Sequence, residues 1–247
     1  MLNHSVDKDP MSSERDRKAN STESAAPHPC AERLYRNQGN IPLLDMLPPG
    51  RYGTVLDIGC GAGDNARILA TRGWIVHGIT LSPAERTSAA LVCSKVWVHD
   101  LDTGLPKGAA GLYDLALFSH VLEHLRNPEM LLCQTRRILR PGGQIAVALP
   151  NILNWHQRLL FLLGRFEYTE QGIMDVTHLR FYTFSSGRKM LEACGFRVVR
   201  AKAAGSILPW GPLRRAVPSL TSTIDRLFCG INPGLFGRQL LYLASAK

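Results

Sequence analysis

Between residues 53 and 150, short apolar segments alternate with segments whose apolar residues recur at helical spacing. The apolar segments "GTVLDIG", "WIVHGI", "YDLALFS" and "QIAVALP" lack the strict polar alternation of a sheet with one solvated face. Strands of this kind are buried on both sides, as in a parallel sheet covered by helices. The sequence therefore predicts a doubly wound α/β fold with a mostly parallel sheet.

Three glycines, Gly59, Gly61 and Gly63, lie between the first of these strands and the helix that follows it. Glycine lets the backbone turn tightly and approach a ligand without a Cβ, and the start of the next helix offers N–H donors. The spacing GxGxG differs from the dinucleotide spacing GxGxxG, and no phosphate loop ending in Gly-Lys-Ser/Thr is present. A nucleotide-type cofactor other than NAD or ATP is the expected ligand.

The motifs "VLDIGCGAG", "YDL", "LEH" and "LRPGG" follow one another in this order between residues 53 and 151. In this order they resemble the class I S-adenosylmethionine-dependent methyltransferases, which have a seven-stranded Rossmann-like sheet. The resemblance implies that Asp57 and the three glycines hold the methionine part of S-adenosylmethionine. It also implies that Asp100 and the Leu101 backbone contact the adenine, and that Ser119 lies under the cofactor.

Thr80 stands after the second strand, where most of this family carries an acid that grips the ribose diol. The segment "GITLS", with Thr80 and Leu81, resembles the branch of cyclopropane-fatty-acid-synthase-like and tocopherol-methyltransferase-like enzymes. A threonine hydroxyl can bond one ribose hydroxyl, and Glu85, in the first turn of the next helix, can offer a carboxylate to the other. We expect Thr80, Leu81 and Glu85 to form a rebuilt ribose site.

The segment "HVLEH", from His120 to His124, formally matches the HxxEH pattern of inverted zinc peptidases. A zinc site of that kind needs a third protein ligand, and "LEH" is ordinary at this position in the methyltransferase family. We therefore assign no metal ligand. A similar "LEH" contributes to a metal site in quinone-precursor O-methyltransferases, so a divalent ion stays an alternative.

Residues 150–184 resemble a bacterial branch of the family with the pattern "PN…THLRF.T", which is distantly similar to the MetW proteins. Within it, "DVTHLRFYT" places Asp175, His178 and Arg180 among aromatic residues. A hydrogen bond to Asp175 either fixes His178 as a loop support or orients it to take a proton from a hydroxyl. We expect O-methylation, with an arginine positioning an anionic group, and C- or N-methylation stays open. The candidate catalytic residues are His178, His120, His124 and Arg180.

The chain is expected to form one methyltransferase domain over residues 31–247, with acceptor-side segments at 151–184 and 205–237. Residues 1–30 contain few large apolar side chains, so we expect a disordered tail. Six cysteines without a CxxC pair and the lack of an apolar leader are typical of a cytoplasmic protein.

The net charge of +9 is concentrated near the C-terminus. Residues 188–247 contain ten Lys and Arg against two acids, a net charge of +8. This indicates either a solvated basic face or a surface for phosphates, acidic sugars or an anionic membrane, with peripheral membrane contact as an alternative location. No nucleic-acid-binding motif is present, so nucleic acid is not an expected partner. The expected acceptor is a small molecule, a glycan or a lipid-linked compound, and the alternative function is a MetW-like partner subunit that binds the cofactor without transferring a methyl group.

Overall fold

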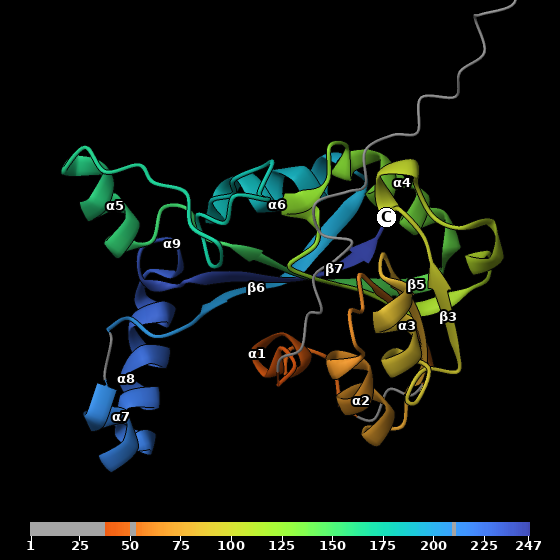
Figure 1. The fold of residues 1–247 in the computed structure, drawn as a ribbon, viewed down its shortest axis with the longest axis horizontal. Helices are drawn as coiled ribbons and strands as arrows, with labels where there is room; N and C mark the ends of the chain where they lie inside the picture. Colours follow the sequence, from red (N-terminus) through yellow and green to blue (C-terminus); the bar gives the residue numbers. More distant parts are fainter. Residues whose placement is uncertain (1–37, 50–52, 209–210) are drawn as a thin grey trace, which may run out of the picture.

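The computed structural model describes residues 38–49, 53–208 and 211–247 (Figure 1). Its centre is a seven-stranded sheet with the order β3-β2-β1-β4-β5-β7-β6. The pairs β3–β2, β2–β1, β1–β4 and β4–β5 are parallel, and β7 is antiparallel to both of its neighbours. The predicted doubly wound, mostly parallel sheet is therefore confirmed. The strands are β1 (Thr54–Ile58), β2 (Ile75–Thr80), β3 (Lys95–Val98), β4 (Tyr113–Ser119), β5 (Leu139–Pro150), β6 (Phe196–Ala204) and β7 (Gln239–Ala246).

Helices cover both faces of the sheet, as Figure 1 shows. One buried cluster joins the sheet to α4 and α6, and a second joins the opposite face to α1, α2 and α3. The α-helices are α1 (Ile41–Leu44), α2 (Asp64–Thr71), α3 (Pro83–Ala89), α4 (Pro128–Ile138), α5 (Trp155–Leu162), α6 (Phe184–Ala193), α7 (Gly211–Ala216), α8 (Pro218–Ile231) and α9 (Pro233–Phe236), and the 3₁₀ helices are η1 (Leu101–Thr103), η2 (Lys107–Ala109) and η3 (Leu122–His124).

Local sequence signals set most helix boundaries. The side chain of Asn127 accepts a hydrogen bond from the Met130 N–H, and Pro128 occupies the first turn, so α4 begins where the sequence predicts. The apolar pattern also predicts that this helix continues to Arg140. It ends at Ile138 instead, because Leu139 already pairs with Tyr113 in the sheet.

Parallel pairing places the carboxyl ends of β1, β2, β4 and β5 at one edge of the sheet. In open α/β sheets, ligands bind in the crevice outside these strand ends. The expected disordered tail, residues 1–30, lies outside the described residues. Within the described ranges, no helix combines the length and the apolar character needed to cross a bilayer.

Candidate active site

A cavity of about 1030 Å³ lies at the carboxyl ends of these strands. It brings together residues from the glycine turn, from the loops after β2, β3 and β4, and from the segment before α6. Two of the predicted cofactor residues, Asp57 and Gly63, do not line the cavity. The predicted residues that line it are Gly59, Gly61, Thr80, Leu81, Glu85, Asp100, Leu101, Ser119, His120, His124 and His178.

The glycine turn has a backbone that only glycine adopts readily. Gly59 and Gly61 have φ angles of +76° and +53°, and both line the cavity. A Cβ on Gly59 would lie 2.5 Å from Cγ2 of Val121. The N–H groups of Gly59 and Cys60 donate to the Ile79 carbonyl, which ties the turn to β2. Gly63, with φ of +90°, is the N-cap of α2, so it shapes the turn from outside the cavity.

Asp57 lies near the end of β1 and is completely buried. Neither of its carboxylate oxygens has a hydrogen-bond partner among the described residues, and burial raises the pKa of this carboxyl to about 7. A buried acid without a partner is complementary to a cation, and S-adenosylmethionine carries both an ammonium and a sulfonium. The residues of this turn therefore fit the cofactor that the sequence motifs imply.

Thr80 and Glu85 both reach the cavity wall, and their side chains are hydrogen-bonded to each other. The Thr80 hydroxyl donates to Oε2 of Glu85 at 2.5 Å, and both side chains are buried while still contributing to the cavity wall. Because the Thr80 hydrogen is used in this bond, the pair presents oxygen acceptors. Acceptors of this kind suit the two hydroxyl donors of a ribose diol.

Asp100 and Ser119 border the same cavity, and both side chains also accept hydrogen bonds from other residues of the protein. Oδ1 of Asp100 accepts from the Asp102 N–H at 2.9 Å, which caps η1 and fixes the Leu101 backbone. Oγ of Ser119 accepts from Nδ2 of Asn40 at 3.2 Å, and Nδ2 of Asn40 also donates to Oε1 of Gln239 at 2.9 Å. The sequence pattern gives no signal for Asn40 and Gln239, which are 199 positions apart.

His120 is held between two oxygen atoms. Its Nδ1 lies 3.2 Å from Oε1 of Glu123, and its Nε2 lies 3.1 Å from Oε1 of Gln239. Burial by itself lowers the pKa of His120, but the hydrogen bonds to Glu123 and Gln239 and the Glu123 charge outweigh it and raise this pKa. Burial also opposes ionisation of Glu123, yet the His120 hydrogen bond and charge lower its pKa. Both ring nitrogens face acceptor oxygens, and the raised pKa favours the protonated imidazolium, so His120 is poorly suited to act as a base.

His178 is oriented by a backbone carbonyl. Its Nδ1 donates to the Ile173 oxygen at 3.0 Å, so the proton is on Nδ1 and Nε2 is left as an acceptor. The expected orienting partner, Asp175, instead accepts from the Thr177 N–H and hydroxyl at 2.8 and 2.7 Å. The predicted side-chain bond between Asp175 and His178 is therefore wrong, although the loop still places His178 at the cavity.

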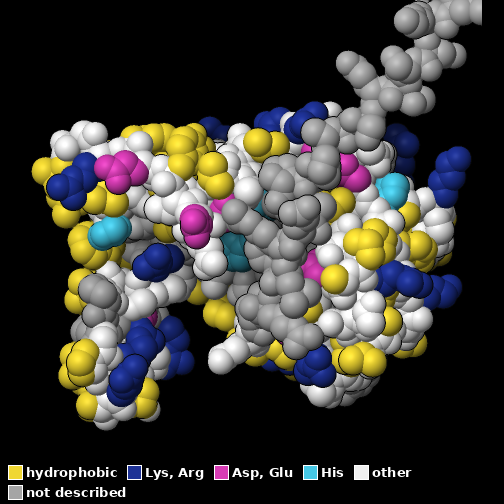
Figure 2. Space-filling view, in the orientation of Figure 1, with side chains coloured by type: hydrophobic (Ala, Val, Ile, Leu, Met, Phe, Trp, Pro, Cys, Tyr) yellow, Lys and Arg dark blue, Asp and Glu magenta, His cyan; other side chains and the backbone are white. Residues whose placement is uncertain are grey.

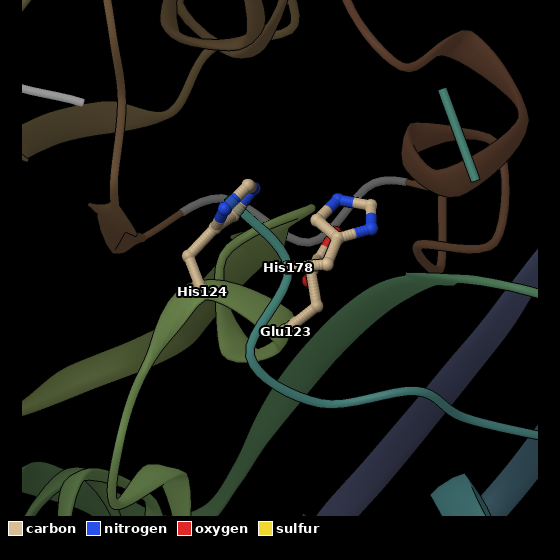
Figure 3. A group of neighbouring side chains, drawn as sticks. All are labelled: Glu123, His124 and His178. Atoms are coloured by element: carbon tan, nitrogen blue, oxygen red, sulfur yellow. The ribbon is translucent and has the colours of Figure 1, made fainter. Parts of the chain in front are cut away.

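Glu123, His124 and His178 form a cluster, shown in Figure 3. One ligand atom from each residue lies within 4.8 Å of the others, and the Glu123 Oε2 atom is buried with no hydrogen-bond partner in the described part of the chain. The Leu179 and Arg180 N–H groups donate to the Glu123 carbonyl, which holds the His178 loop against η3. Burial, only partly offset by Glu123, lowers the pKa of His124. Two imidazoles and a carboxylate are a donor set that can hold a divalent cation.

Arg180 points elsewhere. Its Nη2 donates to the Arg126 carbonyl at 2.6 Å, and its Nη1 lies 3.7 Å from Oε1 of Glu129. It does not line the cavity, so the expected role in positioning an anionic acceptor has no support from its placement. Of the two expected acceptor-side segments, only parts reach the cavity: the stretch around residues 170–178, and Gly205.

Comparisons with known proteins find similarity to methyltransferases. The family model of a methyltransferase domain matches residues 31–201, more than half of the chain. A 2-methyl-6-phytyl-1,4-hydroquinone methyltransferase from Synechocystis is 35% identical over 199 residues, covering 76% of this chain and 57% of that protein. A ubiquinone biosynthesis O-methyltransferase from Dechloromonas aromatica is 31% identical over 133 residues, covering 50% of this chain and 55% of that protein. The chain thus spans a little over half the length of these two relatives.

Solved structures show the same fold at low sequence identity. An S-adenosylmethionine-dependent methyltransferase from Mesorhizobium loti aligns with a TM-score of 0.55 and 20% identity, covering 83% of this chain and 95% of that chain. A possible histamine N-methyltransferase from Thermotoga maritima aligns with a TM-score of 0.59 and 17% identity, covering 83% of this chain and 87% of that chain. With the matched family model and the glycine turn at the end of β1, the chain belongs to the class I S-adenosylmethionine-dependent methyltransferase family.

Proposed function

We propose that this chain transfers a methyl group from S-adenosylmethionine to a hydroxyl oxygen, and that the acceptor is a phenol or quinol. The observation that carries the proposal is a single cavity lined both by the cofactor residues and by His178. The names of the relatives support the acceptor class, because they refer to a hydroquinone and to ubiquinone biosynthesis.

S-adenosylmethionine supplies a methyl group on a sulfonium, and the sulfur leaves as the neutral thioether of S-adenosylhomocysteine when the methyl group is transferred. The protein therefore has to bind the two reactants side by side, orient them and exclude water. The turn at Gly59 and Gly61 and the Thr80–Glu85 pair line the cavity and would hold the cofactor, and the buried Asp57 carboxylate behind the turn would supply a negative charge. The histidines after β4 and before α6 form the acceptor side.

We assign the removal of the hydroxyl proton to His178. The Ile173 carbonyl fixes the proton on its Nδ1, so Nε2 can accept another. The unperturbed pKa of a phenol is near 10, as for tyrosine, so a neutral imidazole that approaches the hydroxyl in the transition state is a sufficient base. Methylation of a phenol's ring carbon also releases a proton, so the position of the labelled methyl group in the product, and not the His178 requirement, distinguishes O- from C-methylation.

The test compares His178→Asn with His156→Asn, a matched change at an exposed histidine of α5. With a catechol as acceptor and methyl-labelled cofactor, His178→Asn should lower turnover roughly 10²- to 10⁴-fold and leave cofactor affinity unchanged. The control should behave like the wild type. Near-normal turnover of His178→Asn would exclude the role of base.

A second candidate mechanism uses a divalent cation held by Glu123, His124 and His178. The buried, unpartnered Glu123 Oε2 is the observation that favours it, because such an atom normally has a hydrogen bond or a cation. A cation bound there would lower the pKa of an acceptor hydroxyl. Calorimetry with Mn²⁺ should then show one site that Glu123→Gln removes, and a chelator should abolish turnover; the absence of both effects excludes this mechanism.

A partner-subunit function is the alternative to catalysis. In that case the chain binds the cofactor but forms no labelled product with any phenolic acceptor or with cell extract. The same labelling assay distinguishes the two functions, because the proposed enzyme forms product without another protein.

A further inference from the structure

Two extensions project from one end of the sheet, as Figure 1 shows. The α5 extension comprises residues 155–168, and the α7–α8 extension comprises residues 211–231. In Figure 2, hydrophobic and basic side chains gather on both. Among the described residues, nine of the eighteen large exposed apolar side chains lie in these two extensions. Exposed apolar side chains that serve no common purpose are scattered singly over a protein surface. A concentration of them in two elements indicates a binding surface.

Helix α8 carries its apolar stripe on the outer side. Leu220, Leu227 and Ile231 are spaced by seven and four residues, so they share one face, and all three are exposed. The buried residues of α8 are Thr221, Asp225 and Cys229, on a different face. A helix that only covers a core would turn the leucines inward.

Asp225 explains why the polar face is the inner one. Its Oδ1 accepts from the Ile207 N–H at 3.0 Å, and its Oδ2 accepts from Arg214. These bonds attach α8 to α7 and to the segment after β6. The orientation of the helix is therefore fixed by a buried polar anchor, and the apolar stripe stays outside.

The α5 extension has the same inverted arrangement. Leu159, Leu162 and Leu163 are exposed at helical spacing, whereas the buried residue of α5 is Gln157. Leu162 is 84% exposed, more than any other large apolar side chain among the described residues. Two separate elements thus present leucines to the surroundings at the same end of the molecule.

The charges on the two extensions identify the kind of partner. Together they contain five arginines and two acids, and one of those acids is the buried Asp225. Apolar side chains flanked by arginines are typical of helices that lie in the headgroup region of an anionic bilayer. We propose that the α5 and α7–α8 extensions dock this protein on an anionic phospholipid membrane.

Both extensions are connected to segments that line the cavity, so docking on a membrane would affect which substrates can reach it. The loop after the α5 extension and Gly205, before the α7–α8 extension, both border the cavity. A bilayer held by the two extensions lies close to the cavity entrance. If the proposed methyl transfer holds, the acceptor is a lipid-soluble or lipid-linked phenol that reaches the cavity from the membrane.

The test is flotation of the full chain with vesicles, without cofactor or acceptor, so that its outcome does not depend on the proposed function. Phosphatidylcholine vesicles are compared with vesicles that also contain phosphatidylglycerol. The wild type should float with the anionic vesicles, and added salt should weaken this binding. Lack of binding to the anionic vesicles would overturn the proposal.

Matched variants separate the stripe from general hydrophobicity. Leu227→Gln with Ile231→Gln should weaken vesicle binding at least about tenfold, because two apolar side chains that would be buried in the bilayer interface are replaced by polar ones. Leu91→Gln with Leu112→Gln changes two leucines that are exposed elsewhere and should have no effect. Equal losses of vesicle binding in the two double variants would contradict membrane docking. So would a wild-type protein that forms a dimer, does not bind vesicles, and becomes monomeric only in the Leu227→Gln, Ile231→Gln variant.

Discussion

Changing Asp57 to asparagine removes one buried charge and should alter how stability depends on pH. Burial raises the pKa of this carboxyl from 3.8 to about 7 in the folded protein. A difference of about three pKa units corresponds to roughly 4 kcal/mol. The unfolded chain ionises near pH 4 and the folded chain near pH 7, so this stability is fully present below about pH 4, is lost as pH rises towards 7 and then levels off.

The assay is urea unfolding of the cofactor-free protein at several pH values from 4 to 8. Relative to the Asp57→Asn variant, the wild type should lose up to about 4 kcal/mol of unfolding free energy across this range. An unpaired asparagine amide costs about 1–3 kcal/mol at every pH, so the informative quantity is the slope and not the absolute stability. Glu167→Gln, at an exposed carboxylate in the segment after α5, is the control and should keep the wild-type slope.

The same variant should bind the cofactor less tightly, because it lacks the negative charge that a bound cation needs. We expect at least about a tenfold loss of affinity for S-adenosylmethionine by calorimetry. Parallel stability curves for the variant and the wild type, or equal affinities, would refute the reasoning about this carboxyl.

Four further substitutions test the ribose site, the glycine turn and the core. Glu85→Gln should weaken S-adenosylhomocysteine binding about tenfold in calorimetry, and combining it with Thr80→Val should cost less than the sum, because the two share a hydrogen bond; additive losses would contradict the pairing. Gly59→Ala should weaken the same binding, since its Cβ would lie 2.5 Å from Cγ2 of Val121, and normal affinity would show that the turn tolerates a side chain. Phe118→Ala should lower the free energy of urea unfolding by about 3–5 kcal/mol, because this side chain is fully buried, and a loss below 1 kcal/mol would place it outside the core.

The parts of the site that the sequence predicts are those set by local geometry. Strand β1 and the glycine turn follow from apolar runs and glycine spacing, and both confirm the expected fold. Thr80 and Glu85 are five positions apart, at a strand end and in the first turn of the next helix, so their contact follows from chain connectivity.

The remaining contacts of the site join residues that are far apart in the sequence, so they depend on the tertiary fold. Gln239 reaches His120 because β7 inserts between β5 and β6, and no local pattern encodes that insertion. The hydrogen-bond acceptor of His178 is the Ile173 carbonyl and not the expected Asp175 side chain. A sequence motif cannot predict this, because every residue has a backbone carbonyl. Apolar spacing in α8 predicts a helix, but a buried Asp225 decides which face turns inward.

Calorimetric titration of the full chain tests whether the cavity beside the glycine turn binds S-adenosylmethionine. We expect one site per chain for S-adenosylmethionine, competition by S-adenosylhomocysteine, and no binding to a folded Gly61→Val variant. A wild-type protein that binds neither compound, or a Gly61→Val variant that binds as tightly as the wild type, would contradict the account.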